Sequence, residues 1–119
     1  MITLKKEVQA ALSAACENLI YGYPRYFEAL PLIAWRESLN RRHAQADGAE
    51  YLSELNYTLE IFAPSSESAN ELLISADNAL IRMGMRRENA AEQFEADASL
   101  SHITARYRCL ADEQGNISQ

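Results

Sequence analysis

The sequence is poor in the residues that catalytic and metal sites use most. It has two histidines, His43 and His102, and two cysteines, Cys16 and Cys109, far apart in the chain. Neither cysteine belongs to a CxxC pair or neighbours a histidine, so buried free thiols are expected. His43 lies in a polar loop with no third ligand nearby, which does not predict a metal site. His102 is expected at the surface or in an interface, because no partner for acid–base catalysis can be identified.

Glycine is also scarce. Only four glycines occur, and each marks a turn or the end of a predicted helix. None remains for a phosphate-binding loop, and the GxGxxG, Walker-type, HExxH and GxSxG patterns are missing. We therefore expect no catalytic residue, no cofactor and no metal. An enzyme stays an alternative that would require a cluster of titratable residues in a cleft.

Long apolar runs and a basic field are missing as well. The longest apolar stretches, such as residues 30–35, are far shorter than the roughly 20 residues that span a bilayer. The N-terminus turns polar at Lys5 and lacks the apolar segment of a signal peptide. The net charge is −6, which disfavours general attraction to nucleic acid or to an anionic membrane. These features predict a cytoplasmic protein without specific nucleic-acid binding.

The 119 residues, 48% of them apolar and 24% charged, are sufficient for one folded domain. Two segments carry apolar residues at steps of three and four, the spacing of one helix face. Residues 3–20 form the first predicted helix, with Thr3 as its cap. Residues 65–83 form the second, which Ser65 or a Ser68-x-x-Glu71 box would cap and Gly84 would end. Its buried face is expected at Ala69, Leu72, Leu73, Ala76, Leu80 and Met83.

Strands are predicted where apolar and polar residues alternate. Residues 50–63 and 100–111 show this alternation most clearly, residues 30–39 show it less, and residues 85–90 form a weak candidate. Residues 89–99 are small and acidic and are expected to form a loop. The order α-β-β-α-β-β predicts an α+β fold, a two-layer sandwich in which both helices cover one face of a four-stranded, mainly antiparallel sheet.

The chain is expected to form a single domain over residues 1–119. The polar stretch 40–48 is interpreted as a long hairpin loop with an Asp47-Gly48 turn. Together with its flanking strands it predicts a projecting hairpin arm at about residues 36–54.

Two groups of residues are candidates for contact with a partner protein. Ile74 and Ile81 lie seven residues apart and away from the core stripe of the second helix, although scattered exposure explains them equally. The second group makes two basic spots on an acidic protein and consists of Arg36, Arg41, Arg42, Arg106 and Arg108. Solvation is the simple interpretation of these arginines, and an interface is the alternative.

Several stretches resemble the tail-terminator and related tail-completion (minor tail) proteins of tailed bacteriophages and prophages. They are residues 21–25 (YGYPR), 30–37 (LPLIAWRE), 46–51 (ADGAEY), 57–63 (YTLEIFA), 83–87 (MGMRR) and 103–108 (ITARYR). The predicted element order also agrees with that family, so the resemblance extends over nearly the whole chain.

The resemblance implies a structural role in a virion tail. The chain would form a ring, of six subunits in the assembly and monomeric before it, that ends the tail tube and joins it to the head. Its partners would be copies of itself, tail-tube proteins and head-completion proteins, met first in the bacterial cytoplasm and then in the virion tail. The alternative from another class is a small-molecule or regulatory binding module, which would need a concave apolar pocket with converging polar groups.

Overall fold

The computed structural model describes residues 1–24, 29–45, 51–96 and 99–119. Two helices and six strands follow one another in the order α1 (Lys5–Ala15), β1 (Leu19–Tyr21), β2 (Leu32–Gln45), β3 (Tyr51–Ala63), α2 (Ser66–Met83), β4 (Arg86–Glu95), β5 (Leu100–Ala111) and β6 (Ile117–Ser118). Within the part of the chain that the structure describes, no helix is long and apolar enough to cross a membrane.

The predicted four-stranded sheet is wrong, because the sheet has six strands and is mixed. Its order is β1-β2-β3-β5-β4, with β6 paired to the far end of β5. β1 pairs with β2 in parallel, and the other pairs are antiparallel. β1 and β6 have three and two residues, which is too short for a readable alternation. They form because backbone hydrogen bonds to longer strands hold them in place.

The long polar segments also differ from the prediction. β2 continues to Gln45, so most of the predicted loop 40–48 is strand, and the Asp47-Gly48 turn lies outside the described residues. β4 spans most of the predicted loop 89–99. It lies at the sheet edge and is exposed on both faces at nearly every position, so its residues carry no apolar alternation. Pairing with β5 makes it a strand.

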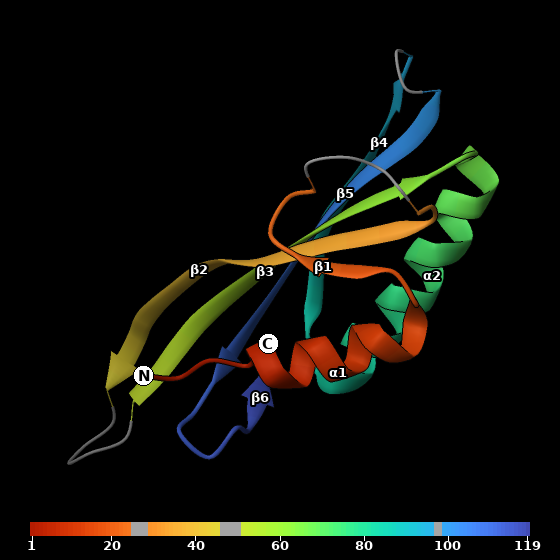
Figure 1. Cartoon of the computed structure of the whole chain (residues 1–119). Helices are drawn as coiled ribbons and strands as arrows, with labels where there is room; N and C mark the ends of the chain where they lie inside the picture. Colours follow the sequence, from red (N-terminus) through yellow and green to blue (C-terminus); the bar gives the residue numbers. More distant parts are fainter. Residues whose placement is uncertain (25–28, 46–50, 97–98) are drawn as a thin grey trace.

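The main core lies between the sheet and the two helices, which pack on the same face (Figure 1). We call this the inner face. β3 contributes Leu55, Tyr57, Leu59 and Ile61, all fully buried. α2 contributes Ala69, Leu72, Ala76 and Leu80 as predicted, whereas Leu73 at the margin of that stripe is only half-buried.

The helix ends correct two details of the sequence analysis. α1 is shorter than residues 3–20, and its N-cap is Leu4 without a side-chain cap bond. The Thr3 hydroxyl donates instead to Glu37 Oε1 at 2.7 Å. α2 begins with a capping box between Ser65 and Ser68, and Gly84 ends it with a φ of 109°, a left-handed conformation that favours glycine.

The molecule is long and narrow, with principal extents of 54 × 24 × 21 Å. The β2–β3 hairpin extends beyond α1 at one end, and the β4–β5 hairpin extends beyond α2 at the other (Figure 1). Among the described residues, β2 loses its outer partner strand after Trp35, and β4 has no strand on its outward side. Both ends of the sheet therefore present unpaired backbone edges.

Truncation of α2 side chains tests the orientation of that helix. Leu80→Ala should reduce the free energy of unfolding by about 2–5 kcal/mol, because Leu80 is fully buried. Leu73→Ala should reduce it by only about 1 kcal/mol, because its side chain is half-buried. Urea denaturation gives both values, with exposed Asn78→Ala as the control. A loss for Leu80→Ala no larger than the control would show that the helix is turned differently.

Candidate functional site: the ion-paired outer face

The outer face of the sheet, opposite the helices, carries two buried carboxylates. Both belong to the central strand β3, where Glu54 is 8% and Glu60 is 6% exposed. A buried carboxylate is strongly destabilising unless charged or hydrogen-bonding partners compensate it. The partners here come from the strands on either side.

Glu54 binds one arginine from each neighbouring strand. Arg41 of β2 donates to Oε1 through Nε and Nη2 at 3.1 and 2.7 Å. Arg108 of β5 donates to Oε2 through Nε at 3.1 Å. The hydrogen bonds from Arg41 and then Arg108 lower the pKa of Glu54 below its usual value. This cluster joins three strands at the β2–β3 end of the sheet.

Glu60 accepts hydrogen bonds from three side chains. Thr104 donates to Oε1 at 2.6 Å, His102 Nε2 lies 2.7 Å from the same oxygen, and Arg36 Nη1 lies 3.2 Å from Oε2. Burial raises the pKa of Glu60, but the bonds from Thr104, His102 and Arg36 outweigh it, so the pKa is lowered. Glu60 is thus held as a carboxylate inside the sheet face.

His102 is buried, which corrects the expectation that it lies at the surface. Its second ring nitrogen, Nδ1, lies 3.1 Å from Glu95 Oε1 on β4, and the ring stacks on Phe62 at 4.3 Å between centroids. Nδ1 also lies 3.3 Å from Gln93 Nε2 of β4, so His102 links Glu60 of β3 to two side chains of β4. Sequence spacing could not show this contact, because residues 60 and 102 meet only through the β3–β5 register.

The Glu54 and Glu60 clusters link neighbouring strands of the sheet to one another. The His102 and Glu60 side chains are 7% and 8% exposed, and each is already engaged by neighbouring strands. Within the described ranges, no group of three or more His, Cys, Asp or Glu residues is arranged to hold a metal ion. Cys16 and Cys109 are free and buried as predicted, and burial raises the pKa of Cys109 to about 11.

The structure places the predicted contact residues at separate sites. Arg41 and Arg108 meet on Glu54, and Arg36 joins the Glu60 cluster. Arg42 is exposed on the β2–β3 hairpin with its guanidinium 4.5 Å from the Tyr51 ring centroid, and exposed Arg106 donates to Asn89. Part of each basic spot is therefore neutralised within the chain. Their role in partner contact stays a prediction.

The two isoleucines of α2 lie on its solvent side. Ile74 is 61% and Ile81 is 43% exposed. A second exposed apolar group was not recognised in the sequence and consists of Ile20, Tyr21 and Tyr23, in and just after β1. β1 has only three residues, so no alternation of apolar and polar residues in the sequence could reveal this group.

Two of the hollows in the described part of the chain lie beside the first turns of α1. One of about 460 Å³ lies between the N-terminal segment and the turn 112–115, and acidic Glu7, Asp112 and Glu113 are among its lining residues. The other, of about 400 Å³, is lined by Lys5, Lys6, Gln9, Tyr21 and Trp35. The second combines aromatic walls with two positive charges.

Comparison with known proteins shows a likeness in fold. No protein-family model matches the sequence, and no curated protein matches it significantly. A chain in the virion of a native gene transfer agent (GTA) particle matches with a TM-score of 0.58 and 12% sequence identity. The match covers 85% of this chain and 81% of that one. At this identity the likeness establishes the shared fold.

The Glu60 cluster predicts a pH-dependent stability. Because the pKa of Glu60 is lowered in the folded state, its contribution is complete above the unfolded value, about 4.3, and is lost as pH falls through the folded pKa. Glu60→Gln should reduce the free energy of unfolding at pH 7 by about 1–3 kcal/mol.

Urea denaturation from pH 7 to pH 2.5 checks this prediction. The difference between wild type and Glu60→Gln should shrink as the solution becomes acidic. The control is Glu92→Gln, an exposed carboxylate on β4. A difference that stayed constant over the whole pH range would contradict the role given to Glu60.

Proposed function

We propose that this chain is a structural subunit of a phage-like virion. The observation that carries the proposal is the shared fold with a virion subunit over most of both chains. The resemblance of several sequence stretches to phage tail-terminator proteins also supports it. A structural role also agrees with the outer face, where buried polar groups bind one another rather than surround an open site.

Within the virion, we propose the role of a tail terminator. Several copies form a ring at the head-proximal end of the tail tube, stop its growth and offer a surface to the head. The long, narrow shape supports this role, because hairpins that extend past the helices can reach neighbouring copies. The open edges of β2 and β4 supply backbone groups for such contacts. Neither catalysis nor a cofactor enters this role.

The arm over residues 36–54 is proposed to contact a neighbouring subunit or tail protein. Arg41 keeps 65% of its side chain exposed although it pairs with Glu54, and Arg42 is exposed as well. Arginine forks recognise carboxylates with defined orientation. An acidic neighbour can therefore bind here without breaking the Arg41–Glu54 pair.

Deletion of the encoding gene tests the terminator role. The expected result is filled heads without attached tails, together with tail tubes longer than normal, because nothing caps their growth. Electron microscopy of the particles measures both, and mass spectrometry should find the chain in complete wild-type tails. Complementation with the intact gene is the control. Normal particles from the deletion would contradict the proposal.

Shortening the hairpin tests the arm separately. Arg42 and Ser53 are register partners, so replacing residues 43–52 by Asn-Gly closes a two-residue turn on an existing pair. The Arg41–Glu54 bond is kept, and the monomer should remain folded, with one cooperative unfolding transition in urea. The variant should fail to complement the gene deletion. Arg41→Ala with Arg42→Ala in the full-length chain should likewise fail to complement, and normal tails from both variants would refute the arm contact and leave the terminator role intact.

A further inference from the structure

Two exposed surfaces of the molecule are complementary in shape and charge. The first, which we call the basic patch, consists of Lys5, Lys6, Gln9 and Tyr21 around the hollow in front of Trp35. The second, which we call the acidic stripe, consists of Glu67, Glu71, Ile74 and Ile81 on α2. Neither surface takes part in the ionic clusters of the outer face.

The basic patch surrounds a shallow, open hollow with two aromatic side chains. Tyr21 is 50% exposed and meets Trp35 edge-to-face, with ring centroids 4.7 Å apart. Trp35 Nε1 donates to Gln9 Oε1 at 3.1 Å, which fixes the indole at the base of the hollow. Lys5 Nζ lies 5.2 Å from the Tyr21 ring centroid, and Lys6 has no ion pair among the described residues. The hollow can therefore receive an apolar side chain flanked by carboxylates.

The acidic stripe has that composition. Positions 67, 74 and 81 are seven residues apart, which places them on nearly the same line along a helix. Glu71 lies one turn before Ile74 on the same side, so the carboxylates and isoleucines form one surface. Neither Glu67 nor Glu71 has an ion pair within the part of the chain that the structure describes. Arg82, the nearest positive charge of α2, lines a hollow with α1 residues instead.

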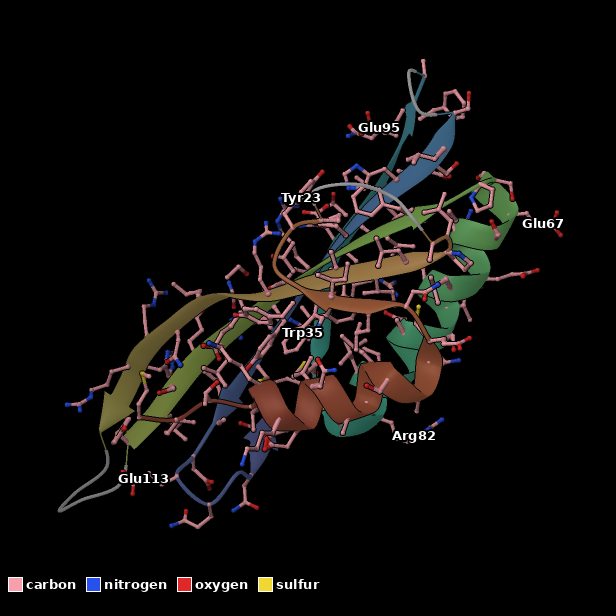
Figure 2. The ribbon with its side chains drawn as sticks, in the orientation of Figure 1. Tyr23, Trp35, Glu67, Arg82, Glu95 and Glu113 are labelled. Carbon is pink, nitrogen blue, oxygen red and sulfur yellow. The ribbon has the colours of Figure 1, made fainter. Side chains whose placement is uncertain are left out.

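The acidic stripe and the basic patch of one molecule do not contact each other. Figure 2 shows Glu67 at one end of α2, with its side chain directed away from the sheet, whereas Trp35 lies in the middle of the sheet behind α1. α2 buries Ala69, Leu72, Ala76 and Leu80 against its own sheet, which leaves the stripe to solvent. Both surfaces are therefore open to another molecule.

We propose that the acidic stripe of one copy of this chain docks on the basic patch of a second copy. Ile74 enters the hollow beside Tyr21, and Glu67 and Glu71 pair with Lys5 and Lys6 at its rim. An apolar centre with a charged rim is the usual anatomy of a protein interface. Because the two surfaces differ, the contact is head-to-tail and generates a closed ring or an open filament. The inference rests on the self-association in the proposed function and names its contact.

Disulfide trapping between two variants, each with one added cysteine, tests the contact. Ile74→Cys and Lys6→Cys are purified separately, mixed, oxidised mildly and analysed on a non-reducing gel. Native Cys16 and Cys109 are buried and free, so they contribute little background. The mixture should give a disulfide-linked heterodimer. The control mixture is Glu113→Cys with Lys6→Cys, because Glu113 is exposed on the turn before β6. Equal trapping in both mixtures would overturn the contact, even for a weakly associating monomer.

Charge reversal tests the ion pairs. Lys5→Glu in the Lys6→Cys chain should slow trapping with Ile74→Cys, because a carboxylate then faces Glu67 and Glu71. Glu67→Lys with Glu71→Lys in the Ile74→Cys chain should restore it, and 1 M salt, where the screening length is about 3 Å, should reduce the difference. A trapping rate that stays the same after all three changes would exclude the proposed charge pairing.

Trapping inside assembled tails separates this inference from the proposed function. If the chain is present in tails and terminates them, but Lys6→Cys cross-links to another tail protein, the terminator role stands and the self-contact is refuted. If the heterodimer forms in solution but the chain is missing from tails, the contact stands and the terminator role fails.

Discussion

Strand β3 is buried on both faces, and the neighbouring strands must therefore compensate its outer side chains. On the inner face the helices cover Leu55, Tyr57 and Leu59. On the outer face Glu54 and Glu60 need charged partners, because an unpaired buried carboxylate would be strongly destabilising. Those partners come from β2, β5 and, through His102, from β4. Shifting any strand by one residue would move its partner to the opposite face, so the ion pairs specify one register.

This arrangement leaves particular surfaces for other molecules. Much of the arginine charge that appears basic in the sequence is used inside the sheet, which leaves the exposed parts of Arg41 and Arg42 and the guanidinium of Arg106, whose partner is a neutral amide. The surfaces left exposed include the open backbone edges of β2 and β4, the apolar side chains in and just after β1, and the solvent side of α2. They are distributed around a narrow molecule, as expected for a subunit with neighbours on more than one side.

The elements with one apolar face were predictable. α2, β3 and β5 agree with the sequence analysis to within one residue at each end, because each presents an uninterrupted 3.6- or two-residue period. Gly84 ended α2 as predicted, since glycine adopts the left-handed conformation without strain. The prediction marked only the first residues of β4, as the weak candidate 85–90, and it missed the rest of that strand and residues 41–43 of β2, whose exposed, polar side chains give no period. It also failed for β1 and β6, which exist only through pairing with longer strands.

The candidate contact residues show the same difference between what the local sequence predicts and what only the tertiary structure decides. The sequence by itself determined that Ile74 and Ile81 share a helix face away from the core, because helical geometry is local. It also determined which residues alternate on β3 and β5. Only the tertiary structure decided that Arg41 and Arg108 meet on Glu54, that His102 lies between Glu60 and Glu95, and that Tyr21 lies over Trp35. These contacts join residues distant in the chain, and their geometry depends on strand order and register, which no local pattern encodes.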